Sequence, residues 1–571
     1  MAKTLQYWGT GNFQEHPYTG RIVTWTEKGK QTVDDAIAAK LLAANAGFVL
    51  DNDSTGEVVT SQINSVTGGI ALSAAGQTLN TTLRKNRKTL LVGDSIAQFF
   101  LDSAPSVTAI VDNGNGTATA TFSGSHNYYV GSEIFVNSAP QSKFNTFGSL
   151  VTAQQNSNPY TVTYALSSRN SPVTGANDAA TLCYYMKRYS CLGGASWFEF
   201  FAGDKINWTL ACAGGAESTQ ALTMLNDALS LGEIYDDVIV CCGMNDIYAH
   251  GNSYATNQTN LAALLVKAAN TGARLWTLLV PPRNSADAIW SAGKQTIHNQ
   301  TNKWLWEYTR SLGGTPIDLW RATHNGSTWI NSGATNPDPT TGFTSSSDYT
   351  HPLNIGASAM GLAISSVFSA NGPRSFVGSH GGITGQGNLF ANPKLTGTGG
   401  TKTAGSGTIN GTVPDSWTVE ITWGTPTVTL TSPARTVSAD GDADGNNLQA
   451  VFAWSGSGTQ VFRLINTTSL HGSVTPGTRY RVKFPVTITG ASGMTGMECV
   501  LFGANPTNGN TNIGTLLGTS QAMAGSFSGA FVIPDWVAPS GMTSLSAYAR
   551  FYFNSGGATI VFGKPTFEPV I

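Results

Sequence analysis

Charge is scarce in this sequence. Only 11% of its 571 residues are charged, and the formal net charge is −2, whereas an average domain has about 25% charged residues. The chain has no basic excess and no polybasic run, so nothing in it predicts binding to nucleic acid or to an anionic lipid surface. Its 65 glycines and many hydroxyl and amide side chains indicate a neutral polar surface rich in turns, which is typical of β architecture.

Cysteines and long apolar runs are also few. The six cysteines lack the spacing of metal ligands, so we interpret all of them as free, mostly buried thiols. No window approaches the ~18 apolar residues of a membrane span. The opening MAKTLQYWGTGNFQEH lacks the basic region and apolar run of a signal peptide. We therefore expect a chain that is made in a cytoplasm and does not insert into a membrane.

The chain is too long for a single core, so several domains are expected. Residues 1–60 form an N-terminal unit in which helical spacing predicts a helix over 32–51. Residues 61–85 are rich in Gly, Ser and Thr and are typical of a linker. We interpret the N-terminal unit as an adaptor or attachment domain.

Strand-like and helix-like segments alternate over residues 86–104 and 188–372, which predicts an α/β domain with a parallel sheet. Residues 105–187 interrupt it with short alternating runs rich in Thr, Val and Tyr, typical of an inserted β domain. Residues 375–571 contain only turn-separated strand patterns, which predict a β-sandwich. The predicted fold class is thus multidomain, α/β plus all-β.

The apolar run Leu90–Val92 stops abruptly at Gly-Asp-Ser, residues 93–95. Ligands of open α/β sheets bind outside the carboxyl ends of the strands. A serine on a tight turn at such an end could be a nucleophile, or it could cap the following helix. This stretch alone leaves both interpretations open.

A nucleophilic serine needs a base, and the base needs an orienting partner. His351 lies in SSSDYTHPLN, three residues after Asp348 and directly before a proline, which disfavours helix at this position. In such a loop Asp348 could hold the imidazole through Nδ1 and leave Nε2 free as the base. The alternative is a loop histidine that caps the next helix.

Acyl transfer also needs hydrogen-bond donors for an oxyanion. The Asn245 amide in CCGMNDIYA follows one apolar run, and Gly214 and Gly215 in CAGGAEST follow another. Taken singly, each could be an ordinary turn. Their fixed order with Ser95 and His351 along the chain favours the catalytic interpretation.

In this order of motifs the sequence resembles the SGNH (GDSL-type) hydrolase family. The matching stretches are GDS at 93–95, a glycine of GGAEST, GMND at 243–246 and DYTH at 348–351. The resemblance implies a flavodoxin-like three-layer α/β/α domain. It implies Ser95 as nucleophile, His351 as base and Asp348 as its partner. It also implies an oxyanion hole built from the Ser95 amide, the Gly215 amide and the Asn245 side chain. The implied reaction needs no metal or cofactor.

One departure from the family pattern leaves a point open. No asparagine precedes the glycine of the second block, so Gly214 remains an alternative to Gly215, although the spacing to Ser218 favours Gly215.

Three further residues, Arg283, Tyr349 and His250, are candidate substrate contacts. Three tryptophans of the last domain could form a sugar-stacking platform, although we expect at least two of them to be core residues: Trp417, Trp423 and Trp454.

The flanking domains suggest a substrate. The N-terminal unit is similar to segments that open bacteriophage structural proteins, and residues 375–571 resemble carbohydrate-binding jelly-roll modules. We therefore expect an O-acetylesterase of a phage tailspike or tail fibre that deacetylates a bacterial surface polysaccharide, either O-antigen or capsule. Its expected location is the virion tail, attached to the tail or baseplate through the N-terminal domain, as a homotrimer by analogy with fibres. The alternatives are a non-catalytic, lectin-like tail adhesin and a general lipase or carboxylesterase.

Overall fold

The computed structural model describes most of the chain from residue 88 onward and a few strands before it. The ranges it describes are 2–7, 13–15, 23–25, 30–34, 48–50, 88–98, 102–103, 107–126, 128, 130–131, 133–137, 144, 146–155, 157–166, 177–178, 182–186, 188–203, 206–230, 234–283, 287–323, 350–371, 388–435, 445–466, 469–506, 511–518 and 521–569. The predicted linker over 61–85 lies outside them, as do Asp348 and Tyr349.

A five-stranded parallel sheet forms the centre of the α/β domain, in the order β16-β6-β17-β18-β19. Its strands are β6 (Lys88–Gly93), β16 (Asn207–Cys212), β17 (Asp237–Cys241), β18 (Arg274–Leu278) and β19 (Thr315–Ile317). The first strand in the chain thus lies second in the sheet, with later strands on both sides. This is the doubly wound order 2-1-3-4-5, as expected from the sequence.

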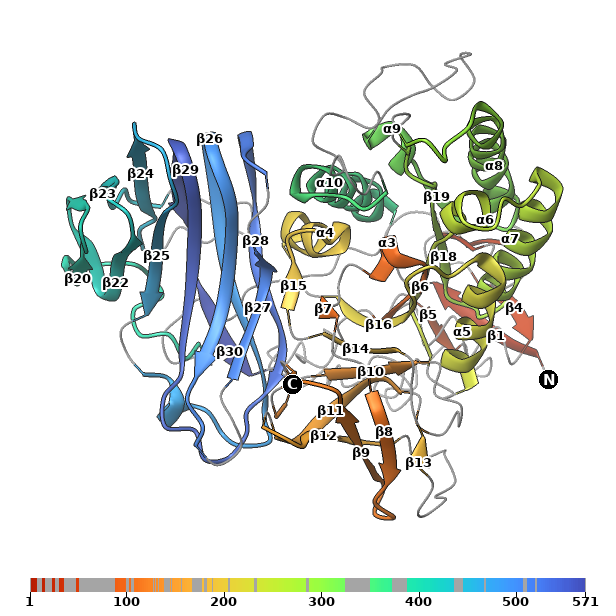
Figure 1. The fold of residues 1–571 in the computed structure, drawn as a ribbon, viewed down its shortest axis with the longest axis horizontal. Helices are drawn as coiled ribbons and strands as arrows, with labels where there is room; N and C mark the ends of the chain where they lie inside the picture. Colours follow the sequence, from red (N-terminus) through yellow and green to blue (C-terminus); the bar gives the residue numbers. More distant parts are fainter. Residues whose placement is uncertain are drawn as a thin grey trace.

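Helices cover both faces of this sheet (Figure 1). In chain order they are α3 (Ser95–Gln98), α4 (Gly194–Ala202), α5 (Ser218–Ser230), α6 (Met244–Tyr248), α7 (Tyr254–Ala269), α8 (Ala292–Ser311), α9 (Leu319–Thr323) and α10 (Asn354–Asn371). Of these, α4 and α10 pack on the face that presents Leu91, Ile239 and Leu278. They cross closely, because a Cβ on Gly361 would lie 2.4 Å from that of Trp197.

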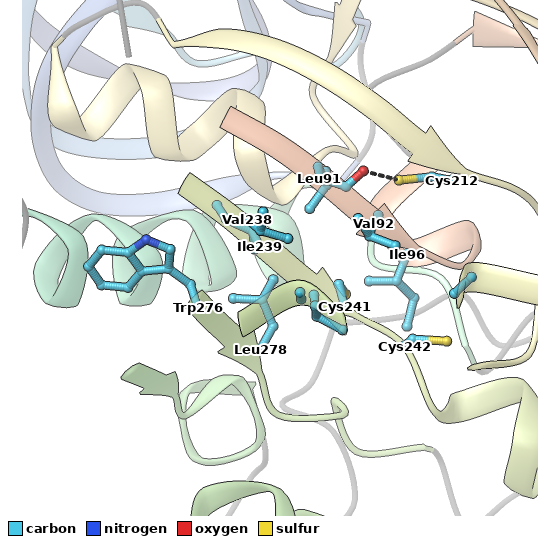
Figure 2. Packing of buried hydrophobic residues seen from close by; sticks show 14 of the residues in the cluster. Leu91, Val92, Ile96, Cys212, Val238, Ile239, Cys241, Cys242, Trp276 and Leu278 are labelled. Carbon is cyan, nitrogen blue, oxygen red and sulfur yellow. Dashed lines mark hydrogen bonds between the residues drawn. The ribbon is translucent and has the colours of Figure 1, made fainter. Parts of the chain in front are cut away.

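Apart from their first residues, the strands between them are buried at every described position. Figure 2 shows Leu91, Ile239 and Leu278 on the neighbouring strands β6, β17 and β18, and all three belong to one buried apolar cluster. Strand β17 is buried at all five positions, which is what parallel strands covered on both faces require. The five cysteines whose side chains are described are free and buried; of these, the Cys212 thiol donates to the Leu91 carbonyl oxygen at 3.2 Å.

An eight-stranded antiparallel sheet is inserted between α3 and α4, in the order β13-β8-β9-β12-β11-β10-β14-β7. Its strands are β7 (Asp102–Ser103), β8 (Val107–Asp112), β9 (Thr117–Phe122), β10 (Glu133–Asn137), β11 (Thr146–Gln155), β12 (Tyr160–Ala165), β13 (Asn177–Asp178) and β14 (Leu182–Met186). In β9 every second residue is buried, so the alternation of small and polar residues seen in the sequence marks its two faces.

The C-terminal domain is a branched sheet of twelve strands. They are β15 (Arg188–Ser190), β20 (Gly399–Thr403), β21 (Thr408–Asn410), β22 (Val413–Trp423), β23 (Thr427–Thr431), β24 (Leu448–Trp454), β25 (Gln460–Asn466), β26 (Arg479–Gly503), β27 (Thr511–Leu517), β28 (Met523–Val537), β29 (Ser546–Phe562) and β30 (Thr566–Pro569). The long β29 pairs with β25 along one half and with β24 along the other. This branching encloses one aromatic core but does not by itself establish a jelly roll.

Two sequence expectations need correction. The predicted helix over 32–51 is wrong at both of its ends. There the chain forms β4 (Lys30–Asp34) and β5 (Phe48–Leu50), which flank β1 (Ala2–Tyr7) in an antiparallel sheet. Residues 35–47 between them lie outside the described part. The backbone hydrogen bonds supplied by β1 override the local helical spacing. A separate hairpin joins β2 (Phe13–Glu15) and β3 (Val23–Trp25).

The second correction concerns residues 188–190, which were assigned to the α/β domain. They form β15 and pair in parallel with β27 of the C-terminal sheet. Of the three tryptophans considered for sugar stacking, Trp417 is fully buried and Trp454 packs partly buried against the core, whereas Trp423 is 68% exposed. None of the described helices is both long and apolar enough to cross a membrane.

Candidate active site

The site lies where three neighbouring strands end. Gly93, the last residue of β6, is paired with Cys212 of β16 on one side and with Cys241 of β17 on the other. A Cβ at Gly93 would lie 1.9 Å from the Cys241 carbonyl oxygen, so only glycine fits between the strands. The next residues, Asp94 and Ser95, are thereby held at the mouth of the sheet.

The turn after β6 resolves the two interpretations of Ser95. The Asp94 carboxylate accepts the Ile96 backbone N–H at 2.9 Å and so caps the first turn of α3. Because Asp94 already caps this helix, Ser95 is available for another partner. Its Oγ lies 2.8 Å from Nε2 of His351, which is 256 residues away in sequence. The structure therefore joins the serine and the histidine that the sequence singled out.

The loop that carries His351 is fixed by Arg283. The Arg283 guanidinium donates to the hydroxyl of Thr350, the residue before His351. It also pairs with the Asp287 carboxylate at 2.6 Å and lies 3.5 Å above the Tyr248 ring. Arg283 is only 2% exposed, and substrate contact by Arg283 stays a prediction. Its contacts make it a positioning residue for the histidine loop.

The glycine turn lies beside the end of β6, because the Ala213 N–H donates to the Gly93 carbonyl oxygen at 3.2 Å. The turn closes with the Ala216 N–H donating to the Ala213 oxygen at 3.2 Å. Gly215 has φ +76°, a conformation that glycine adopts without strain. This conformation explains why residue 215 is a glycine. It does not decide whether Gly214 or Gly215 presents its amide to a ligand.

Asn245 is tied to this turn. Its Nδ2 donates to the Ala216 carbonyl oxygen at 3.0 Å, and the side chain is buried at 8% exposure. An asparagine amide has two N–H donors, so one fixes the orientation of the group and the second is available to a ligand. Asp246, the next residue, accepts both the backbone N–H and the hydroxyl of Ser218 and anchors the start of α5. Asp246 therefore braces the turn.

The remaining candidate contacts are placed as follows. His250 is 45% exposed at the side chain, and its Nδ1 lies 3.8 Å from the Glu217 carboxylate, at the rim above the glycine turn. Substrate contact by His250 stays a prediction. Asp348 and Tyr349 lie outside the described residues, so their roles also stay predictions. In the part of the chain that the structure describes, no cluster of His, Cys, Asp or Glu is arranged to hold a metal ion.

Burial changes the acidity of Asp94. This carboxyl is 1% exposed, and desolvation, together with the nearby Asp246, raises its pKa to about 7. The native protein therefore holds a proton on Asp94 at pH values where the unfolded chain has already lost it. It follows that the free energy of unfolding should fall as the pH rises from about 4 to about 7.

We expect the free energy of unfolding of Asp94→Asn to fall by up to about 4 kcal/mol less than that of the wild type between about pH 4 and pH 7. The asparagine amide has no proton to lose, and its oxygen can still accept the Ile96 N–H. Urea unfolding of both proteins at pH 4, 5, 6 and 7 measures the effect. Parallel curves for the two proteins would contradict the assignment, since every other titrating group is shared.

The comparisons with known proteins find structures that are similar to only part of this chain. No protein-family model and no curated protein matches the chain. A GDSL-like lipase from Bacteroides thetaiotaomicron is 17% identical over 28% of this chain and 76% of that one, with a TM-score of 0.24. A lipase/acylhydrolase from Enterococcus faecalis is 18% identical over 29% and 77%, with a TM-score of 0.24.

One similar structure comes from a virus. The enzymatically active domain of tailspike protein 4 from bacteriophage CBA120 is 14% identical over 27% of this chain and 19% of that one, with a TM-score of 0.19. Solved structures similar to part of this chain thus include GDSL-type hydrolases and one tailspike domain. At these identities and scores, the chemistry of the site has to be argued from its own geometry.

Proposed function

We propose that this protein is a serine ester hydrolase. The observation that carries the proposal is the 2.8 Å contact between Ser95 Oγ and His351 Nε2 at the end of β6. In a first step His351 takes the serine proton while Oγ attacks the ester carbonyl, and the protonated histidine then gives that proton to the leaving alcohol. In a second step a water activated by the same histidine releases the acid.

The tetrahedral intermediate carries a negative charge, for which the three strand ends supply donors. The proposed donors are the Ser95 amide, the Gly215 amide and the Asn245 side chain. The anchored Asn245 amide supports this arrangement, because an oriented donor needs no reorganisation when charge develops. Asp348 is the proposed partner of His351.

For the substrate we propose short acyl groups, namely O-acetyl groups on a bacterial surface polysaccharide. The sparse charge and abundant hydroxyl and amide groups of the chain suit contact with sugars.

The experiment is a chain-length series with p-nitrophenyl acetate, butyrate and octanoate, followed by acetate release from O-acetylated xanthan. If the protein acts on acetyl groups, we expect kcat/KM to fall from acetate to octanoate by at least about tenfold. A preference for octanoate would favour the general lipase instead. If the folded protein hydrolyses none of these substrates, the hydrolase proposal fails and the lectin-like adhesin becomes the better one.

We further propose that the protein acts in a phage tail, attached through residues 1–60, and that the C-terminal domain contacts the polysaccharide. The exposed Trp423 supports a sugar contact. The homotrimer stays a prediction, and light scattering would test it.

A further inference from the structure

The catalytic histidine lies close in sequence to a contact between two domains. Helix α10 begins at Asn354, three residues after His351. The Asn354 amide donates to the backbone oxygen of Gln521 at 2.7 Å and accepts the backbone N–H of Gln521 at 3.1 Å. Gln521 belongs to the C-terminal domain, between β27 and β28. Asn354 is 1% exposed, so water does not compete for these bonds.

The surrounding packing makes this contact part of a continuous interface (Figure 1). Trp197 and Phe200 of α4 and Ala357 of α10 belong to the same apolar cluster as the core of the C-terminal domain. The Phe200 ring lies 5.3 Å from that of Phe531. A Cβ on Gly529 of β28 would come within 2.3 Å of the Phe200 carbonyl oxygen, so strand and helix backbones are in close contact.

The chain itself also crosses this interface. The segment β15, which leads into α4, is a strand of the C-terminal sheet through its parallel pairing with β27. After α4 the chain enters β16, and β16 ends at the glycine turn of the site. Both the segment before the glycine turn and the helix after His351 are therefore held by the C-terminal domain. In contrast, Ser95 follows directly on β6 of the central sheet.

We propose that Asn354 is a positioning residue, through which the C-terminal β domain sets the place of His351 relative to Ser95. The inference rests on the proposed hydrolase function. It assigns the C-terminal domain a role in the chemical step as well as in any sugar binding. A side chain that bonds both the N–H and the carbonyl of one backbone unit fixes distance and orientation together, so its loss should let the start of α10 shift. Misplacement of a catalytic group by about 1 Å can cost about a hundredfold in rate.

The test is kinetic and uses the full chain. We expect Asn354→Ala to lower kcat for p-nitrophenyl acetate by about 10- to 100-fold with little change in KM. Asn354→Asp keeps the volume and the acceptor but lacks the N–H for the Gln521 oxygen, so its kcat should also fall. The matched control is Asn388→Ala. Asn388 is another buried asparagine that bonds backbone groups of the C-terminal domain, and its loss should lower stability while leaving kcat within twofold.

A second readout does not need activity. Hydrogen–deuterium exchange of the peptide spanning 350–360 should be faster in Asn354→Ala than in the wild type and in Asn388→Ala. If the wild type hydrolyses no ester, the hydrolase proposal fails, and the exchange measurement still tests whether Asn354 holds the start of α10. If kcat of the folded Asn354 variants stays within twofold of wild type, or exchange at 350–360 is unchanged, the inference is overturned.

Discussion

Replacing Ser95 with alanine is expected to lower kcat for p-nitrophenyl acetate by at least about 10⁴-fold, because the hydroxyl that forms the acyl-enzyme is gone. Stability should change little. Asp94, and not Ser95, caps α3, so the substitution removes no bond that holds the turn. Steady-state kinetics and a urea unfolding curve measure both effects. The matched control is Ser230→Ala, an exposed serine at the end of α5, which should leave both quantities unchanged.

The same variant separates catalysis from binding. If the C-terminal domain contacts the polysaccharide, Ser95→Ala should still be retarded in a native gel that contains O-acetylated xanthan, while releasing no acetate from it. Residual hydrolysis within tenfold of wild type would exclude Ser95 as the nucleophile. Loss of hydrolysis together with loss of the folded state would mean that the serine is structural.

Substituting Asn245 with alanine is expected to reduce kcat by about 10²–10³-fold, the cost of removing one oxyanion donor. The KM should change little, because the donor acts on charge that develops only in the transition state. Asn245→Asp has the same size, but its carboxylate offers no N–H and repels the oxyanion, so its kcat should be lower still. Measuring kcat and KM for both variants tests the assignment.

Asn245 also donates to the Ala216 carbonyl oxygen, so part of the loss could come from a displaced glycine turn. The matched control is Asn466→Ala in β25. Asn466 is also buried and donates to two backbone carbonyls far from the site in sequence, so its loss should affect stability only. If kcat for Asn245→Ala stays within threefold of wild type, Asn245 is not an oxyanion donor.

Much of the fold could be predicted from local patterns. The alternation of apolar strands and amphipathic helices after residue 195 predicted the parallel sheet, because a strand covered on both faces has to be apolar throughout. Helix α8 shows the limit of such patterns. It begins at Ala292, capped by Ser291, but its first turns are polar and display little apolar periodicity that would mark this start. The helix predicted over 32–51 is wrong at its two ends for the opposite reason: its periodicity is local, but strand pairing with β1 decided the conformation of residues 32–34 and 48–50.

The sequence by itself determined the residue types of the site and their order at the ends of strands, because turns that end parallel strands have a recognisable glycine-rich signature. It did not determine which side chain caps α3, because this depends on the direction of the Asp94 carboxylate. The burial of Arg283 against Thr350 and the bonds between Asn354 and Gln521 were decided only by the tertiary structure. These contacts join residues that are 67 and 167 positions apart in the sequence. The second contact is made to the backbone of Gln521, and a backbone group is the same whatever residue type stands there, so the sequence does not mark it.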